Sequence, residues 1–298
     1  MINATTISVP PIFSWSKIID YLQRNEDEIT YQITAQQTIR KAFQDNHQIL
    51  IVDISFLRNK RQLCLQVINH SSASVTHEII DYVCDWFDLK TDLAPFYEMA
   101  KKDELLAPLI DRFDGLRLVG EPDFYEALTW CILGQQINLS YAYTLKKRFV
   151  ENFGTKIVFH KHTFWLYPQP AEVAVQDPEK LRQLGMTQHK AEYMLNISKL
   201  LVTGAIKKSQ YLRQQTATKT EKMLCKLRGI GPWTANYVAM RCLRYGDAFP
   251  QTDAGLLNGI KLIQQLDEKP SKQQMRKLHQ QWGQWSSYAT FYIWRLLY

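Results

Sequence analysis

Two glycines separated by one apolar residue are the feature that most restricts how this chain can fold. Gly229, Ile230 and Gly231 lie within residues 227–235, between two segments whose residue pattern predicts helices. Glycine adopts positive φ at no steric cost, so this spacing permits a very tight reversal. Pro232 suits the first turn of the second helix, where backbone N–H groups can bind a phosphate oxygen without any side chain. Two interpretations are open: a plain corner that Ile230 plugs against the core, or a phosphate-binding hairpin.

The charge of the chain is divided unevenly between its two parts. Residues 1–114 contain 11 basic and 16 acidic side chains, whereas residues 115–298 contain 25 basic and 13 acidic ones. The net charges are therefore −5 and +12, which together give the +7 of the whole chain. A basic domain attracts polyanions, chiefly nucleic acid. Charge alone leaves a solvated, lysine-rich surface as an equally good interpretation.

Composition argues against several classes of protein. No run approaches the roughly 18 apolar residues that a membrane-spanning helix needs. Residues 1–18 lack the basic start and the continuous apolar core of a secretory signal, so we expect a cytoplasmic protein with no membrane association. The five cysteines are scattered and form no C-x-x-C pair, so we predict no zinc or iron–sulfur site.

The first third of the chain is predicted to be an α+β domain with an antiparallel sheet. Residues 28–35, 49–56 and 62–69 are rich in β-branched and aromatic residues, as strands are, and residues 58–61 resemble a hairpin turn between the last two. A helix is predicted over residues 75–89, where apolar residues recur at helical spacing. We place the end of this domain at residue 114.

From Asp123 onward the pattern predicts one helix after another, and hence an all-α domain over residues 115–298. Asp123, Ser140, Asp177 and Thr187 are placed to cap the starts of successive helices. Further helices are expected over residues 220–227, 232–244, 253–266, 271–282 and 286–297. We expect such a protein to be a monomer.

Residues beyond the two glycines resemble the helix-hairpin-helix DNA glycosylases. That superfamily has the pattern L-x-G-[IV]-G-x-x-T-A, which here runs from Leu227 through Thr234 to Ala235, followed by an invariant aspartate. Residues 124–137 and 184–191 resemble further segments of the same superfamily. Residues 282–294 are similar to the end of its inducible DNA-3-methyladenine glycosylase II (AlkA-type) members. The resemblance implies an enzyme that excises alkylated bases from duplex DNA, with no redox or organic cofactor.

Asp253 occupies the position of the superfamily's catalytic aspartate. Breaking an N-glycosidic bond builds positive charge on the sugar, which a fixed carboxylate stabilises while it orients or deprotonates water. The plainer interpretation is that Asp253 only caps the helix that follows it. The two roles are compatible, because the helix dipole favours an ionised carboxylate there.

Trp233 stands where strand-cutting relatives of this superfamily carry a lysine. An indole has no amine with which to form a Schiff base. The resemblance therefore implies a monofunctional glycosylase, in which Trp233, Tyr237 and Trp294 line a pocket for a flipped base. Aromatic faces attract a cationic alkylated purine. Ordinary core packing is the alternative for each of the three rings.

Gln135 and Gln136 follow an apolar helix face, and the resemblance places them at the DNA minor groove, where one side chain fills the gap left by the flipped nucleotide. A polar helix end is the alternative for this pair. Two other functions remain open for the chain as a whole. One is a non-catalytic helix-hairpin-helix DNA-binding protein, which has no need of Asp253. The other is an oxidised-base glycosylase, which would carry lysine at position 233.

Overall fold

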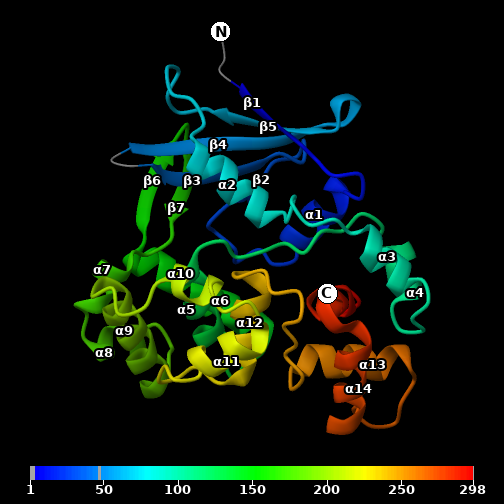
Figure 1. The fold of residues 1–298 in the computed structure, drawn as a ribbon. Helices are drawn as coiled ribbons and strands as arrows, with labels where there is room; N and C mark the ends of the chain where they lie inside the picture. The colour runs from blue at the N-terminus through cyan, green and yellow to red at the C-terminus, as the bar shows by residue number, and fades with distance from the viewer. Residues whose placement is uncertain (1–3, 46–47, 298) are drawn as a thin grey trace.

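A five-stranded antiparallel sheet forms the N-terminal layer of the molecule. The computed structural model describes residues 4–45 and 48–297, and the sheet lies at the top of Figure 1. Its strands run in the order β1-β5-β4-β3-β2. Their bounds are β1 (Ala4–Ser8), β2 (Gln32–Ile33), β3 (Ile39–Asp45), β4 (Gln48–Leu57) and β5 (Gln62–Val67). The hairpin predicted from residues 49–69 is confirmed: β4 pairs with β5 across the short 3₁₀ turn Arg58–Lys60.

The strand predicted over residues 28–35 is wrong for most of its length. Only β2 remains of it, and the preceding residues form a loop. The cause is the side chain of Glu28, which accepts hydrogen bonds from the backbone and hydroxyl of Thr30 at 2.8 and 2.6 Å. These local bonds fold the segment into a turn and direct Glu28 inward, in place of a ladder with the sheet.

Four helices complete the N-terminal part: α1 (Trp15–Leu22), α2 (His77–Trp86), α3 (Ala94–Ala100) and α4 (Ala107–Arg112). Helix α2 confirms the helix predicted over residues 75–89. It buries Ile79, Val83 and Trp86 on one face, as their spacing requires. Figure 1 shows α1 and α2 between the sheet and the helices of the second part. Apolar residues of both parts belong to one continuous core.

The second part is predominantly helical, as predicted. Its elements are α5 (Phe124–Gly134), α6 (Leu139–Phe153), α7 (Pro170–Ala174), α8 (Pro178–Arg182), α9 (Gln188–Val202), α10 (Lys208–Leu212), α11 (Ala217–Leu224), α12 (Pro232–Arg241), α13 (Ala254–Ile263), α14 (Lys272–Trp282) and α15 (Ser286–Trp294). Asp123, Asp177 and Thr187 cap helices as predicted. Ser140 does not; Asn138 caps α6 instead, because it accepts a hydrogen bond from the backbone of Tyr141.

One hairpin interrupts the run of helices and corrects the expectation of an all-α second part. Strands β6 (Thr155–Phe159) and β7 (His162–Leu166) pair across His160 and Lys161, which both adopt positive φ. The hairpin reaches up to the sheet, where Phe164 packs against Ala42 and Ile51. The amide of Gln32 also donates to the carbonyl of Thr163 at 2.7 Å. The hairpin therefore joins the second part to the first.

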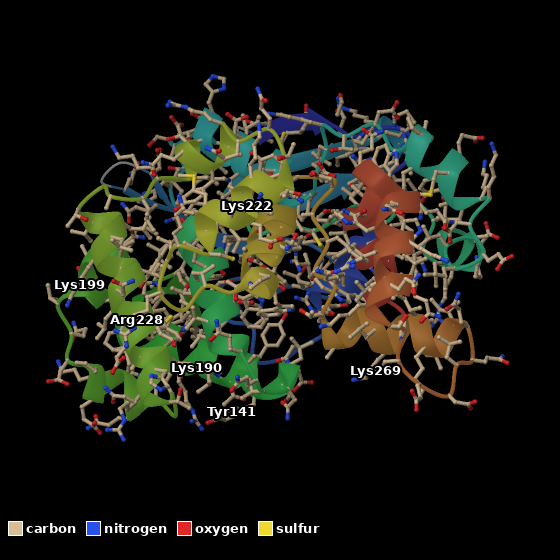
Figure 2. All side chains as sticks on the ribbon, turned by 60° about the horizontal axis from the view of Figure 1, so that its bottom comes forward. Tyr141, Lys190, Lys199, Lys222, Arg228 and Lys269 are labelled. Atoms are coloured by element: carbon tan, nitrogen blue, oxygen red, sulfur yellow. The ribbon has the colours of Figure 1, made fainter. Side chains whose placement is uncertain are left out.

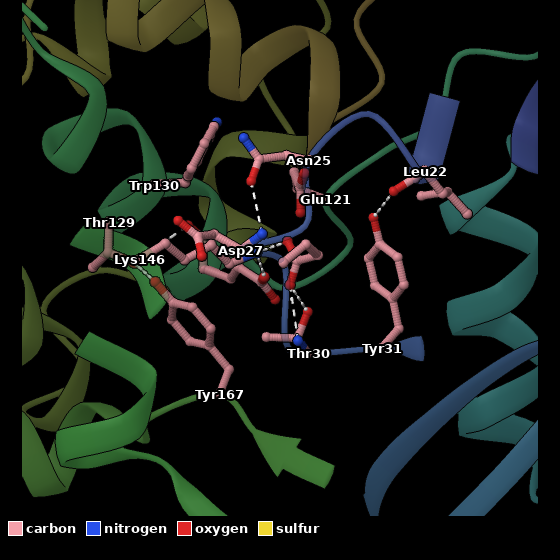
Figure 3. A network of polar contacts seen from close by, with 12 residues as sticks. Leu22, Asn25, Asp27, Thr30, Tyr31, Glu121, Thr129, Trp130, Lys146 and Tyr167 are labelled. Carbon is pink, nitrogen blue, oxygen red and sulfur yellow. Dashed lines mark hydrogen bonds and ion pairs between the residues drawn. The ribbon is translucent and has the colours of Figure 1, made fainter. Parts of the chain in front are cut away.

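A buried cluster of charges forms a second connection between the two parts. The ammonium of Lys146 on α6 lies 2.7 Å from Glu28 and 2.8 Å from Glu126 of α5, and all three side chains are 6% exposed. Figure 3 shows Lys146 and Tyr167 facing the loop that carries Asp27 and Thr30. Burial opposes the charge of Lys146, but the two carboxylates outweigh it and hold its pKa well above the usual range. The negative charges of both buried glutamates are consequently compensated by the same ammonium group.

The ionised form of Glu28 is strongly favoured in this cluster. Burial alone would raise its pKa, but attraction to Lys146 and the hydrogen bonds from Lys146 and Thr30 lower the pKa to about 2. A carboxyl whose pKa is lower in the folded chain stabilises the fold at neutral pH. That contribution is complete above the ordinary pKa of 4.5 and is lost as the pH falls towards 2.

We therefore expect Glu28→Gln to lower the free energy of unfolding by about 3 kcal/mol at pH 7 but by only about 1 kcal/mol at pH 3, by proton linkage. Urea unfolding of the variant and the wild type at both pH values measures this difference. Glu98→Gln is the control, because Glu98 belongs to an exposed pair with Lys101. An equal loss at both pH values would show that charge is not the cause.

Candidate active site

The glycine pair forms a tight connection between α11 and α12. Gly229 has φ +91°, and a Cβ at this position would lie 2.3 Å from the ring of Tyr193, so only glycine fits. Ile230 is buried in the core, where it plugs the turn. Gly231 begins α12, and a Cβ on it would meet no atom within 4 Å. The start of α12 is thus open to an approaching ligand on the side of Gly231, and its first N–H groups have no partner within the helix.

Gln135 braces this connection from the end of α5. Its side-chain amide donates to the carbonyl of Gly229 at 2.8 Å and lies 3.4 Å from the hydroxyl of Thr234. Gln136 follows with φ +57° and an exposed side chain. Of the two glutamines, Gln135 fixes the hairpin and Gln136 projects into solvent beside it.

The carboxylate of Asp253 accepts three hydrogen bonds. Asp253 is the N-cap of α13, and its Oδ1 accepts from the backbone N–H of Leu256 at 2.7 Å. The indole of Trp294 also donates to Oδ1, at 2.7 Å, and the indole of Trp233 donates to Oδ2, at 2.8 Å. The cap expected from the sequence is therefore present, and both carboxylate oxygens have partners.

Tyr237 lies between the two tryptophans that bind Asp253. Its ring centroid is 5.9 Å from that of Trp233 and 5.8 Å from that of Trp294, on which it stacks at 30°. Its hydroxyl accepts hydrogen bonds from the indole of Trp130 at 2.9 Å and from Arg241 at 3.0 Å. Burial raises the pKa of Tyr237 well above the usual range, so the phenol stays protonated. The three aromatic residues that we selected from the sequence thus form one group around Asp253.

Two further residues that support the site were not predicted from the sequence. Trp130 and Arg241 hold the phenol of Tyr237, and both are buried. A tryptophan inside the buried helix α5 needs an acceptor for its indole N–H, which is the signal that could have identified Trp130. Lys190 of α9 lies in the segment 184–191 that resembles the superfamily, but no role was assigned to it from the sequence. Its ammonium donates to the carbonyl of Leu133 at the end of α5, which supports the segment that carries Gln135. Burial lowers the pKa of Lys190.

Exposed cations lie on the face of the molecule that contains the hairpin. Figure 2 shows Lys199 and Arg228 at one side of this face and Lys269 at the other. Arg228 directly precedes Gly229, and its side chain is 68% exposed although it pairs with Glu192. Lys199, Lys222 and Lys269 are exposed as well. A polyanion on this face would meet positive charge around the open start of α12.

The geometry combines a carboxylate with aromatic rings one turn from an open helix N-terminus. Gly231 and Trp233 share the first turn of α12, so a phosphate bound there would place its nucleotide close to Asp253. In the described ranges 4–45 and 48–297, no three acidic, histidine or cysteine side chains are grouped as metal ligands. No helix within those residues is long and apolar enough to cross a membrane.

Comparison with known proteins identifies the family. The HhH-GPD superfamily base excision DNA repair protein model matches residues 129–284. The model of the 8-oxoguanine DNA glycosylase N-terminal domain matches residues 12–128. A DNA-3-methyladenine glycosylase of Bacillus subtilis is 42% identical over 99% of this chain and 98% of the relative. DNA-3-methyladenine glycosylase 2 of Escherichia coli is 31% identical over 60% of each chain.

Solved structures agree in fold. The 3-methyladenine DNA-glycosylase of Archaeoglobus fulgidus superposes with a TM-score of 0.81 at 20% identity, covering 98% of this chain and 97% of that one. An 8-oxoguanine glycosylase/lyase of Clostridium acetobutylicum gives 0.75 at 16% identity, with 98% and 96% covered. The chain therefore belongs to the HhH-GPD superfamily of base excision DNA repair proteins and, within it, to the family of the DNA-3-methyladenine glycosylases.

Proposed function

We propose that this protein hydrolyses the N-glycosidic bond of alkylated bases in duplex DNA, of the 3-methyladenine and 7-methylguanine type, and leaves an abasic site. The observation that carries this proposal is the carboxylate of Asp253 between the indoles of Trp233 and Trp294, one helical turn from the open end of α12. The names of the relatives from Bacillus subtilis and Escherichia coli support it.

In the mechanism that we infer, each group of residues has a separate task. Backbone N–H groups of the turn and of the first turn of α12, such as those of Gly231 and Thr234, bind a phosphate and hold the strand. The damaged base leaves the duplex and lies against the rings of Trp233, Tyr237 and Trp294. A side chain of the Gln135–Gln136 pair faces the minor groove and fills the gap. Asp253 then stabilises the positive charge that develops on the sugar and orients the attacking water.

The oxidised-base alternative has some support from the matched N-terminal model and from the Clostridium structure. The residues around Asp253 favour the alkylated-base proposal. Its hydrogen-bond donors are two indoles and a backbone N–H, and none of them is an amine that could form a Schiff base. A strand-cutting reaction would have no nucleophile among these groups.

Three further points belong to the proposal. We expect a monomer, since a duplex must reach the hairpin face unobstructed. We also expect the protein to be cytoplasmic. We place the boundary between the two domains at residues 114/115, where the chain turns at Gly115 with φ +74°. The domains so defined, 1–114 and 115–298, also include residues 1–3, 46–47 and 298, which lie outside the described residues.

The choice among lesions tests the proposed substrate class. A base that already carries positive charge leaves more readily and is attracted to aromatic faces, so we expect 3-methyladenine and 7-methylguanine to be released faster than 8-oxoguanine. Single-turnover excision from duplexes with one lesion each measures the order. Borohydride should trap no covalent adduct, and the strand should stay intact. Faster release of 8-oxoguanine, or a strong adduct, would refute the proposal.

Asp253→Asn tests the catalytic carboxylate. We expect this variant to bind DNA as the wild type does but to excise bases about 10²-fold more slowly or worse, which is the scale of losing one electrostatic stabiliser. Asparagine retains an oxygen that can cap α13, so the fold should persist. The measurements are single-turnover rates and affinity for an abasic-site analogue. A wild-type rate would show that Asp253 is only a cap.

Gly231→Ala tests the hairpin with little risk to the fold, because a Cβ at Gly231 meets open space. We expect weaker binding to duplexes of any sequence, since the methyl group would obstruct a phosphate near the backbone. Fluorescence titration over a range of salt concentrations measures the effect, and wild-type affinity should fall steeply with salt. Gly229→Ala is the comparison variant, because its Cβ would collide with Tyr193 and strain the turn itself. Unchanged affinity in both variants would make the turn a simple corner.

A further inference from the structure

We infer that Trp233 and Trp294 are positioning residues, whose indole N–H groups hold the carboxylate of Asp253 in its reactive orientation. This inference rests on the proposed function of Asp253. It adds a role beyond that of aromatic surface for the base. The two donors come from different elements, α12 and α15, and reach different oxygens of the same carboxylate, at 2.8 and 2.7 Å.

The helix cap alone would leave this carboxylate free to turn. The backbone N–H of Leu256 fixes only Oδ1, and the last torsion of an aspartate side chain has a broad, shallow preference. A hydrogen bond from Trp233 to Oδ2 and a second bond to Oδ1 from Trp294 define the carboxylate plane. Preorganisation of this kind is what electrostatic stabilisation of a developing charge requires.

Two glycines of α13 allow α15 to deliver Trp294. A Cβ at Gly259 would lie 2.4 Å from Cγ2 of Ile293, and one at Gly255 would lie 3.2 Å from Cδ1 of Trp294. Gly255 and Gly259 are four residues apart and face the same way along the helix. A Cβ at Gly259 would push α15 away, and one at Gly255 would crowd the indole of Trp294, so both glycines let α15 approach α13 closely enough for the indole to reach Asp253. Helix α15 is buried along its whole length, which fixes its position.

Positioning and base stacking use different parts of each indole. The N–H lies in the plane of the ring and points to the carboxylate, while the base would be received by the face. Replacement by phenylalanine therefore separates the two tasks, because it keeps an aromatic face and removes the donor. Trp285 supplies a control at the start of α15, since its indole packs on Phe96 and Tyr288 and has no hydrogen bond to Asp253.

The experiment compares Trp233→Phe, Trp294→Phe and the control Trp285→Phe in the full-length protein. The readouts are single-turnover excision of 7-methylguanine at saturating enzyme and affinity for a tetrahydrofuran-containing duplex. We expect each of the first two variants to be about tenfold slower, the scale of one hydrogen bond to a charged group, with affinity unchanged. The control should match the wild type in both readouts. Thermal unfolding checks that each variant is folded.

A double-mutant cycle with Asp253→Asn distinguishes positioning from stacking. If Trp294 acts through Asp253, then Trp294→Phe slows the wild type but adds nothing in the Asp253→Asn background. An equal slowing in both backgrounds, or none in the wild type, would overturn the inference. Gly259→Ala gives an independent approach, because it should separate α13 from α15 and slow excision while affinity stays constant. Normal excision by Gly259→Ala would count against the inference too.

The failure of this inference can be told apart from the failure of the proposed function. If Asp253→Asn excises 7-methylguanine at the wild-type rate, the catalytic role of Asp253 is refuted. The positioning role of the two indoles is then refuted with it, because there is no catalytic carboxylate to position. If Asp253→Asn is slow while both phenylalanine variants are as fast as the wild type, Asp253 keeps its role and the indoles lose theirs.

Discussion

The rest of this structure depends on one interaction: the pairing of the Lys146 ammonium with the carboxylates of Glu28 and Glu126. It holds an N-terminal loop against α5 and α6 at a place where three charges are removed from water. Removing one partner of such a cluster leaves an uncompensated buried charge, which is why the cluster fixes one arrangement of the two parts. Helix α5 is thereby fixed to the N-terminal part, and α5 provides two supports for the site. Trp130 holds Tyr237, and Gln135 holds the carbonyl of Gly229.

The carboxylate of Asp253 and the phenol of Tyr237 are hydrogen-bonded before any ligand arrives. The carboxylate of Asp253 has donors on both oxygens, and the phenol of Tyr237 has two donors. Such a network costs little to keep buried and does not need to reorganise when charge develops nearby. A rigid site of this kind is suited to a substrate that changes its own conformation, since the energetic cost of unstacking then falls on the nucleotide and is least for a damaged one.

Local rules were sufficient to predict much of this molecule. The hairpin glycines, the cap at Asp253 and the β4–β5 hairpin each depend on residues that are close in sequence. At Glu28 the residue types favoured a strand, whereas the side chain forms a local turn with Thr30 and pairs with Lys146, which lies far along the chain. The β6–β7 hairpin was missed for another reason: its apolar residues stand in short runs, 157–159 and 164–166, without strand-like alternation, and its turn at His160 and Lys161 lacks the usual glycine or asparagine. The indole bonds to Asp253 are tertiary contacts that residue spacing does not encode.

The location of the basic residues qualifies what net charge can say about DNA binding. The sequence assigns +12 to residues 115–298, yet Lys146, Lys190 and Arg241 point inward and are buried. Lys146 compensates buried carboxylates, Lys190 supports the end of α5, and Arg241 holds Tyr237. These cations cannot release counterions from a phosphate backbone, because each is already paired inside the protein. The field at the hairpin face therefore depends on the exposed cations such as Arg228, and the buried ones act on DNA only through the geometry that they maintain.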